Sequence, residues 1–399
     1  MAITPGLLKK LPITSSVVYL LFGLLVGSHG LNVIKLNSME QIKLIEIISE
    51  LTVIISLFTV GLKLKLKLSD PLWILPLSLA TFSMVITVGL IALTAHQLLG
   101  LDIGESILLG AVLSPTDPVL ASEVQLRHPE ERNTMKFILT SEGGMNDGTA
   151  FPLVMLGLGL ILTEGSSFEI AEWIKKDVIW AVFAGISCGI LSGIFISKIT
   201  SHVKEVRKSF YLEDFLAIAS ISLSYGIALQ LHAYGFLAVF ANALTIRQIE
   251  IRKYRFQAEK PKDQIPDNIL SFNEQLEHIF EVVSVGVVGL LIDLASFSWI
   301  SLTMALSVIL IIRPIAVFIG TARSNLDIKA KAFLSWFGVR GIGSIYYLYF
   351  ALNHDGLIED RKSLINNTLW TILVSIFLHG ISAKLILRNF GETPMEKPI

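Results

Sequence analysis

Apolar segments long enough to cross a membrane recur along the whole 399-residue chain. A spanning helix needs about 20 mostly apolar residues, and we predict twelve, of which the eighth is short and the third and fifth are long enough to be tilted, kinked or broken. They lie at 13–30, 44–62, 71–99, 104–125, 133–163, 177–198, 211–231, 233–247, 274–295, 299–322, 328–352 and 366–388. Charged residues make up only 16% of the chain, too little polar surface for a soluble enzyme. We therefore expect an all-α protein that crosses the membrane many times.

The positions of the basic residues predict the orientation of these spans. Cytoplasmic loops of membrane proteins carry an excess of Lys and Arg. If the N-terminus is cytoplasmic, most of the 32 Lys and Arg residues fall into cytoplasmic segments. The outer segments hold Lys35, Lys43, Lys175, Lys176, Arg361 and Lys362. A wrong number of helices would scramble this alternation, so we expect both termini in the cytoplasm. Because no organelle-targeting signal is recognisable, the cell membrane of a bacterium is the expected location.

Domain organisation and partner classes follow from the same counts. The polar stretch 248–273 is interpreted as a cytoplasmic linker too short for a domain, and residues 1–399 as one membrane domain without a soluble regulatory domain. A net charge of −1 gives no reason to expect nucleic acid as a partner. The single cysteine, Cys188, excludes a disulfide framework and any metal site built from several cysteines. No phosphate-binding loop for ATP is visible. We expect no cofactor, and membrane lipid as the surroundings.

Five ionisable residues lie near the middle of predicted spans, where lipid makes a charge costly. They are Asp117, Glu142, Asp147, Arg313 and Arg340. An ionisable residue at this depth is a functional hypothesis by default. Acids nearer the ends of the predicted helices, Glu50 and Glu281 among them, are instead expected at the interface between lipid and water.

The fourth span, "LLGAVLSPTDPVLASEV", is predicted to break. Pro115 and Pro118 bracket Thr116 and Asp117 at its middle, and each proline removes a backbone N–H and clashes with the preceding turn. A break frees carbonyl groups at mid-membrane depth, which is tolerated only where they line a cavity. Interrupted helices with polar residues at the break form ion sites in secondary transporters.

The fifth span, "MKFILTSEGGMNDGTAFPLVMLGLG", places two acids on different faces of one helix. At about 100° per residue, Glu142 and Asn146 lie about 40° apart, whereas Asp147 points about 140° away from Glu142. We therefore expect the two acids to contact different neighbours. The glycines around them, Gly143 and Gly144 among others, allow another helix to approach closely.

Two arginines lie in the tenth and eleventh spans. Arg313 precedes a proline, and its permanent charge requires an anionic partner. Arg340 lies in the Gly-rich centre of the eleventh span, which is therefore predicted to be interrupted like the fourth. Because these spans are seven apart, they cross the membrane in opposite directions. This favours inverted repeats, about 1–163 and 233–399, joined by connecting helices at 164–232, with a site between the repeats.

The motifs at these positions resemble those of the monovalent cation:proton antiporters. "SPTDPV" and "SEGGMNDG", followed by the "RP" of span ten, "WFGVRG" and "HGIS", occur in order between about residue 110 and 382. They are similar to the Asn-Asp branch, which contains bacterial NhaP and the eukaryotic sodium/proton exchangers. The resemblance implies an NhaA-like antiporter fold with two broken crossing helices, usually a homodimer. It also implies exchange of Na⁺, or Li⁺, for H⁺ by alternating access, which is transport rather than enzymatic catalysis.

The resemblance also implies a role for each motif residue. Asp147 is implied to hold a proton and a cation alternately, Thr116 to be a cation ligand, and Asn146 and Asp117 to organise the site. Glu142 and Arg313 correspond to a buried acid–arginine pair, and Arg340 to an arginine near the crossing formed with Pro115 and Pro118. Because Asn146 rather than a second acid precedes Asp147, we expect electroneutral exchange.

Two departures leave the identity of the cation open. Relatives typically have a hydroxyl residue where this chain has Gly143, and many have an acid where "SLFTVGLKL" has Thr59. A K⁺-selective or unselective antiporter is therefore the first alternative. A sodium-coupled symporter of organic anions, a channel, and an intramembrane aspartyl protease that uses Asp117 and Asp147 are further alternatives.

Overall fold

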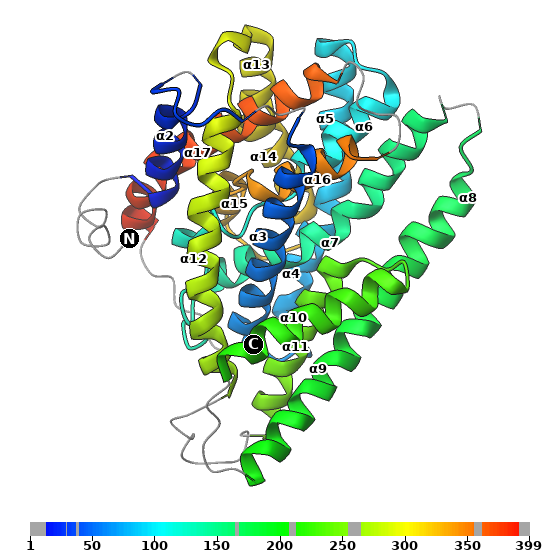
Figure 1. Ribbon diagram of the computed structural model, residues 1–399, viewed down its shortest axis with the longest axis vertical. Coiled ribbons are helices and arrows are strands. Elements are labelled where there is room, and N and C mark those ends of the chain that lie inside the picture. The colour runs from blue at the N-terminus through cyan, green and yellow to red at the C-terminus, as the bar shows by residue number, and fades with distance from the viewer. Residues whose placement is uncertain are drawn as a thin grey trace.

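The computed structural model (Figure 1) describes residues 13–28, 30–36, 40–163, 167–206, 213–253, 265–354 and 361–390. In the described part of the chain, every regular element is helical. The first half contains α2 (Ser15–Val26), α3 (Ile42–Lys63), η1 (Pro71–Trp73), α4 (Ile74–Ser78), η2 (Leu79–Ser83), α5 (Met84–Leu99), α6 (Ile103–Leu113), η3 (Ser122–Val124), α7 (Thr134–Leu162), α8 (Ile170–Trp173), η4 (Ile174–Trp180) and α9 (Ala181–Val206). The second half contains α10 (Glu213–Gln230), α11 (Gly235–Lys253), α12 (Ile265–Leu291), η5 (Leu294–Ser296), α13 (Trp299–Ser307), η6 (Val308–Ile312), α14 (Arg313–Gly320), α15 (Ile328–Trp336), α16 (Ile342–Leu352) and α17 (Lys362–Phe390).

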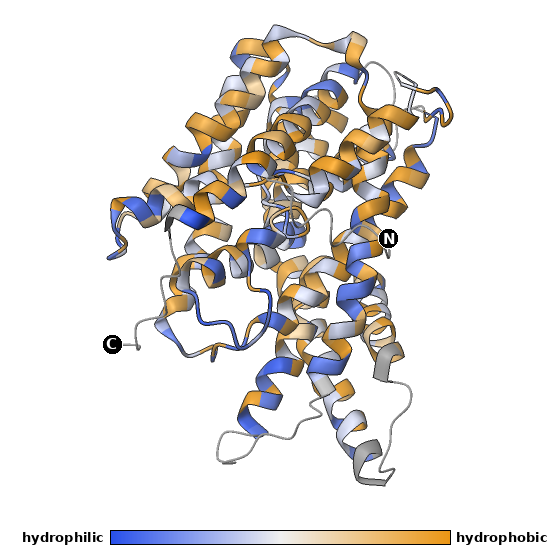
Figure 2. Ribbon diagram, turned by 90° about the vertical axis from the view of Figure 1, so that its left-hand side faces the viewer, coloured by the Kyte–Doolittle hydropathy of each residue, from blue (hydrophilic) through white to orange (hydrophobic). Residues whose placement is uncertain are grey.

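Helices occupy all twelve predicted spans, which confirms the all-α membrane fold. By length and composition, 6 helices of the described chain are able to cross a membrane, and four shorter apolar helices accompany them. Large apolar side chains are exposed on the outer helices; Phe183 is 69% exposed and Leu191 67%. The ribbon coloured by hydropathy in Figure 2 shows that hydrophobic residues predominate along the helices. Such exposure is expected of side chains that face lipid, where apolar surface need not be buried in protein.

The helices form two bundles that meet along α3 and α16. In one bundle, α12 packs on α2 and α3, and α11 packs on α3 and α9. In the other, α6 lies between α5 and α7, α13 packs on α17, and α14 packs on α15. The α16 helix belongs to the second bundle through α6, α7 and α17, but it also packs along α3 of the first.

Two helix boundaries and the burial of one acid differ from the sequence-based predictions. The stretch 248–273 is not all linker, because α11 extends to Lys253 and α12 begins at Ile265. Polar residues of α12 are stabilised by partners on α3; Asn273, for example, donates to the Ile55 carbonyl at 2.8 Å. Glu281, expected at the interface, is therefore in mid-helix and only 3% exposed, and it accepts a bond from Ser16 at 2.9 Å.

The fourth span breaks as expected but does not resume as an α-helix. After α6 ends at Leu113, residues 114–121 form bends and turns, and only the short η3 follows. The eleventh span is interrupted between Trp336 and Ile342. Both interruptions follow from their sequences, since prolines flank one and glycines the other.

Candidate ion-binding site

The two interrupted helices are joined to each other through Asp117. The backbone N–H of Asp117 donates to the Val339 carbonyl at 2.8 Å. Its carboxylate Oδ1 accepts from the N–H groups of Val119 (2.8 Å) and Leu120 (3.1 Å). Oδ2 accepts from the first two N–H groups of α16, those of Ile342 and Gly343. Asp117 thus caps the N-terminus of α16, where a negative charge is stabilised by the helix dipole.

Arg340 binds the other side of the break. Its Nη1 donates to the Ser114 carbonyl and, at 3.0 Å, to the Pro115 carbonyl, which are groups that the end of α6 leaves free. Its backbone N–H donates to Ser375 on α17 at 2.8 Å. The guanidinium is fully buried. A positive charge at the C-terminal end of a helix is favourable, so Arg340 and Asp117 stabilise opposite ends of the crossing.

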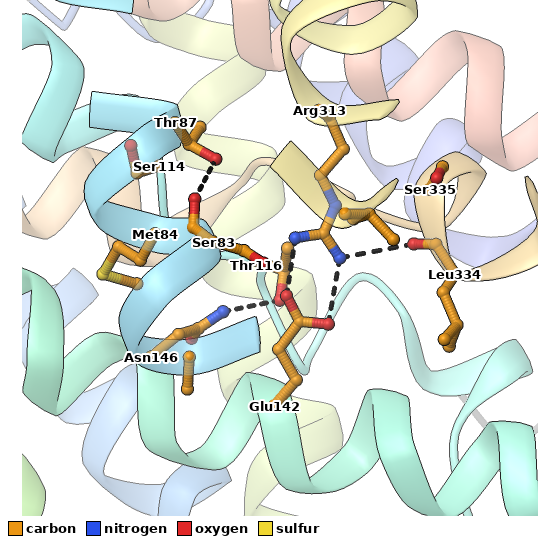
Figure 3. Close-up of polar contacts among 12 residues, drawn as sticks. Ser83, Met84, Thr87, Ser114, Thr116, Glu142, Asn146, Arg313, Leu334 and Ser335 are labelled. Carbon is orange, nitrogen blue, oxygen red and sulfur yellow. Dashed lines mark hydrogen bonds and ion pairs between the residues drawn. The ribbon is translucent and has the colours of Figure 1, made fainter. Parts of the chain in front are cut away.

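Glu142 and Arg313 form a bidentate ion pair between α7 and α14 (Figure 3). Nη1 donates to Oε1 at 2.6 Å and Nη2 to Oε2 at 2.9 Å, and Nη2 also lies 3.3 Å from the Leu334 carbonyl. Both side chains are buried. A Cβ atom on Gly338 would lie 2.7 Å from Arg313 Nε, so only glycine leaves room for the guanidinium. The charge of Glu142 is therefore permanently neutralised.

Asp147 lies on another face of α7, opposite α16, and is 1% exposed. The Tyr347 hydroxyl donates to the Asp147 backbone carbonyl at 2.6 Å and lies 3.4 Å from Oδ1. A Cβ on Gly343 would lie 2.9 Å from Oδ1, so this glycine lets α16 approach. Among the described residues, Oδ2 has no hydrogen-bond partner. A buried carboxylate oxygen without a partner is unfavourable unless a proton or a cation binds it.

Asn146 connects the Asp147 region to the break in the fourth span. Its Nδ2 donates to Thr116 Oγ1 at 2.7 Å (Figure 3), while its Oδ1 has no partner within the described chain. The Asp147 carboxylate, the Asn146 amide oxygen and the Thr116 hydroxyl are hard oxygen ligands of the kind that alkali cations prefer. No group of three His, Cys, Asp or Glu side chains gathers among the described residues. Of the three ligands just named, only Asp147 is a carboxylate.

The sequence analysis missed several residues of this region. Tyr347, Gly343 and Ser375 contact predicted site residues, and Leu334 contacts Arg313. The aromatic run "IYYLYF" directly after the glycine-rich break was the available signal for Tyr347. Eight of the nine predicted residues, by contrast, lie at the crossing or on α7, and the ninth, Arg313 on α14, is bonded to Glu142 of α7.

The two departures from the antiporter motifs have different surroundings. A Cβ on Gly143 would lie 3.6 Å from the Thr116 carbonyl and 3.3 Å from Gln125 Nε2, so this position faces the break. Thr59 instead faces α12, where its hydroxyl accepts a hydrogen bond from Asn273 at 2.7 Å.

Comparisons of the chain with known proteins identify its family. The chain is 25% identical to the K⁺/H⁺ antiporter NhaP of Alkalimonas amylolytica over 95% of its length, but spans only 63% of that relative. It is 25% identical to the Na⁺/H⁺ antiporter NhaH of Halobacillus aidingensis, over 78% of this chain and 74% of the relative. The sodium proton antiporter MjNhaP1 of Methanocaldococcus jannaschii, solved at pH 8, has the same fold, with a TM-score of 0.74, 20% identity, and coverage of 96% of this chain and 94% of that one. The model of the transmembrane sodium/hydrogen exchanger family matches residues 1–389, and the chain therefore belongs to that family.

Proposed function

We propose that the chain exchanges a monovalent cation for protons across the membrane, with Asp147 as the group that binds either ion. The observation that carries the proposal is the contrast on α7: Glu142 is neutralised by Arg313, whereas Asp147 Oδ2 is buried and has no hydrogen-bond partner in the part of the chain that the structure describes. The relatives named above are antiporters rather than enzymes.

Exchange follows from competition for one carboxylate. A proton on Oδ2 removes the negative charge that a cation requires, and a bound cation excludes the proton. If the protein exposes Asp147 to each side in turn, whichever ion is bound is carried across. One carboxylate that carries one charge in each direction moves no net charge. Thr116 and Asn146 serve as ligands or organisers of the cation in this scheme.

Asp117 is not a second ion carrier in this proposal. Its two oxygens accept four backbone N–H groups, so protonation or cation binding would disrupt the crossing. The same contacts argue against an aspartyl protease, which needs two acids that share a water molecule. Asp117, Pro115, Pro118 and Arg340 instead keep the crossing rigid.

The domain organisation and location belong to the same proposal. Residues 1–163 and 233–399 act as inverted repeats, each with one interrupted helix, and 164–232 connect them within one membrane domain. The protein works as a homodimer in lipid, in the cell membrane of a bacterium, with cytoplasmic termini. The antiporter fold and the exposed apolar faces of the helices support these assignments.

Na⁺ is the proposed cation and K⁺ is the alternative, because the relatives are divided between the two ions. NhaH is a Na⁺/H⁺ antiporter, whereas the NhaP of A. amylolytica is a K⁺/H⁺ antiporter. The absent hydroxyl at Gly143 removes a ligand that a small cation would use, which favours the larger ion.

Proteoliposomes with an imposed pH gradient and a fluorescent pH dye test the proposal. We expect Na⁺ or Li⁺ to collapse the gradient in the purified full chain, with Asp147→Asn as the inactive control. A response to K⁺ alone would establish the K⁺ alternative. No response to any of the three ions, from protein that is folded and correctly inserted, would contradict antiport altogether.

A further inference from the structure

The third and tenth spans each contain one π-helical stretch, η2 and η6. η2 begins at Leu79 in the span Pro71–Leu99, and η6 begins at Val308 in the span Trp299–Gly320, at nearly the same distance from the start of each. In a π-helical stretch, i→i+5 hydrogen bonds replace the i→i+4 bonds, and such stretches are frequent at functional sites. η2 packs on α7, and η6 leads directly into Arg313, which binds α7. Both stretches therefore adjoin contacts to the helix that carries the ion site.

Thr149 of α7 binds the backbone of η2. Its hydroxyl donates to the Ala80 carbonyl at 2.6 Å. The other acceptors near this hydroxyl are the carbonyls of Met145 and Asn146, at 3.3 and 3.1 Å, and Met84 Sδ at 3.5 Å. A threonine hydroxyl has one proton, and the shortest of the four contacts crosses to the other helix. Threonine side chains commonly satisfy backbone groups that local π-helical geometry frees in membrane helices.

Glu142 and Thr149 anchor the same face of α7, on either side of Asn146. At about 100° per residue, seven residues bring the helix back to within about 20° of its starting direction. Glu142 is held by its ion pair with α14, and Thr149 is held by η2. Between them, Asn146 donates to Thr116 at 2.7 Å. The two anchors therefore fix the rotation of α7 about its axis, which sets the directions of both Asn146 and Asp147.

We propose that Thr149 is a positioning residue that, through its bond to the Ala80 carbonyl, keeps Asn146 and Asp147 in the orientation that binds the cation. The inference rests on the proposed function, because it concerns the same ion site. Thr149 points about 160° away from Asp147 on the helix, so it does not share a cation with that carboxylate. Without the bond, α7 can rotate, and the apparent affinity falls with the fraction of protein whose ligands are in place.

Deleting the hydroxyl tests this role. Thr149→Val keeps the branched shape of the side chain and Thr149→Ala shortens it, and neither retains the donor. Thr149→Ser keeps the hydroxyl and is the conservative variant. Thr94→Val is the matched control, because Thr94 is half-buried on α5 and donates to the Leu90 carbonyl of its own helix at 2.8 Å.

We expect Thr149→Val and Thr149→Ala each to raise the KM for Na⁺ about two- to fivefold in the proteoliposome assay, with the maximal rate retained. The upper value corresponds to about 1 kcal/mol, the usual net contribution of one hydrogen bond. K⁺ replaces Na⁺ as the probe if only K⁺ is exchanged. Thr149→Ser and Thr94→Val should keep the wild-type KM.

Binding can also be measured without transport. A cation that binds only the folded protein raises the melting temperature. We expect the cation concentration that gives half of the maximal rise, for the full chain in detergent, to increase by the same factor as KM in Thr149→Val and Thr149→Ala. It should remain at the wild-type value in Thr149→Ser and Thr94→Val.

A wild-type KM in both hydroxyl-free variants would overturn the proposal. So would a lower maximal rate at unchanged KM, which would assign the hydroxyl to the transport step, or failure of both variants to fold, which would assign it to the fold alone. A raised KM in Thr149→Ser or Thr94→Val would also contradict a specific role of the hydroxyl. The proposed function fails separately, because the unmodified chain would then show no exchange.

Discussion

The two buried acids of α7 occupy opposite electrostatic environments, although they lie within two turns of the same helix. Glu142 receives two charge-assisted hydrogen bonds from Arg313, at 2.6 and 2.9 Å. Asp147 receives no cationic partner within the described chain, and its Oδ2 accepts no hydrogen bond. A paired charge is part of the scaffold, and an unpaired one can exchange ligands. The helical repeat alone separates these two environments, because it points the acids toward different neighbours.

Removing the unpaired acid should have the largest effect on transport. Asp147→Asn is expected to abolish cation-driven proton movement, because the nearly isosteric amide neither binds a proton nor neutralises a cation. Asp147→Glu should retain partial exchange with weaker cation affinity. Dye recovery in proteoliposomes measures both, and the melting temperature verifies folding. Wild-type exchange in Asp147→Asn would remove this residue from the mechanism.

Breaking the ion pair between Glu142 and Arg313 should lower the stability of the protein rather than abolish transport. Arg313→Ala is expected to destabilise the protein by about 3–5 kcal/mol, because Glu142 would remain buried and uncompensated. Glu142→Ala should do likewise, and the double variant should lose less than the sum. Thermal unfolding in detergent measures this. The exposed pair Arg127–Glu123, at 2.9 Å, is the control, and Arg127→Ala should cost less than about 1 kcal/mol. Strictly additive losses at 142 and 313 would contradict the pairing.

Asp117 should show an intermediate effect. Asp117→Asn replaces one acceptor oxygen by an N–H donor that opposes the backbone N–H groups, so a loss of about 1–3 kcal/mol is expected. Exchange should be slowed but not abolished. Asp327→Asn is the matched control. The Asp327 carboxylate caps the exposed start of α15 by accepting a hydrogen bond from the Ala330 N–H at 2.8 Å, and Asn is an equally good residue at this position. Complete loss of exchange in folded Asp117→Asn would make Asp117 an ion carrier.

The smallest expected effect concerns the missing hydroxyl. Gly143→Ser directs an oxygen toward the break in the fourth span, near the Thr116 carbonyl. We expect the ratio of the apparent affinity for Na⁺ to that for K⁺ to rise about threefold. Gly89→Ser, where no atom lies within 4 Å of the added Cβ, is the neutral control. Identical Na⁺/K⁺ ratios in wild type and Gly143→Ser would show that this position does not contact the cation.

The sequence predicts local breaks and charges better than it predicts their contacts. The two interruptions could be predicted from Pro115, Pro118 and the glycines near Arg340, because proline and glycine determine the conformation of their own backbone. The opposite directions of Glu142 and Asp147 follow from helical geometry. The bond of Tyr347 to Asp147, the capping of α16 by Asp117 and the burial of Glu281 all depend on which helices become neighbours. Tertiary packing determines these contacts, and no local pattern encodes them.

Charge movement during exchange tests the central contrast most directly. If Arg313 neutralises Glu142 and Asp147 carries one proton or one cation, the cycle moves no net charge. Proteoliposomes with a cation gradient and a membrane potential clamped by valinomycin and K⁺, or by another permeant ion if K⁺ is transported, measure this. The account predicts exchange rates that do not change with the imposed potential, and no current on a supported membrane. A transient current whose size follows turnover would contradict it, because a second charge would then have to move.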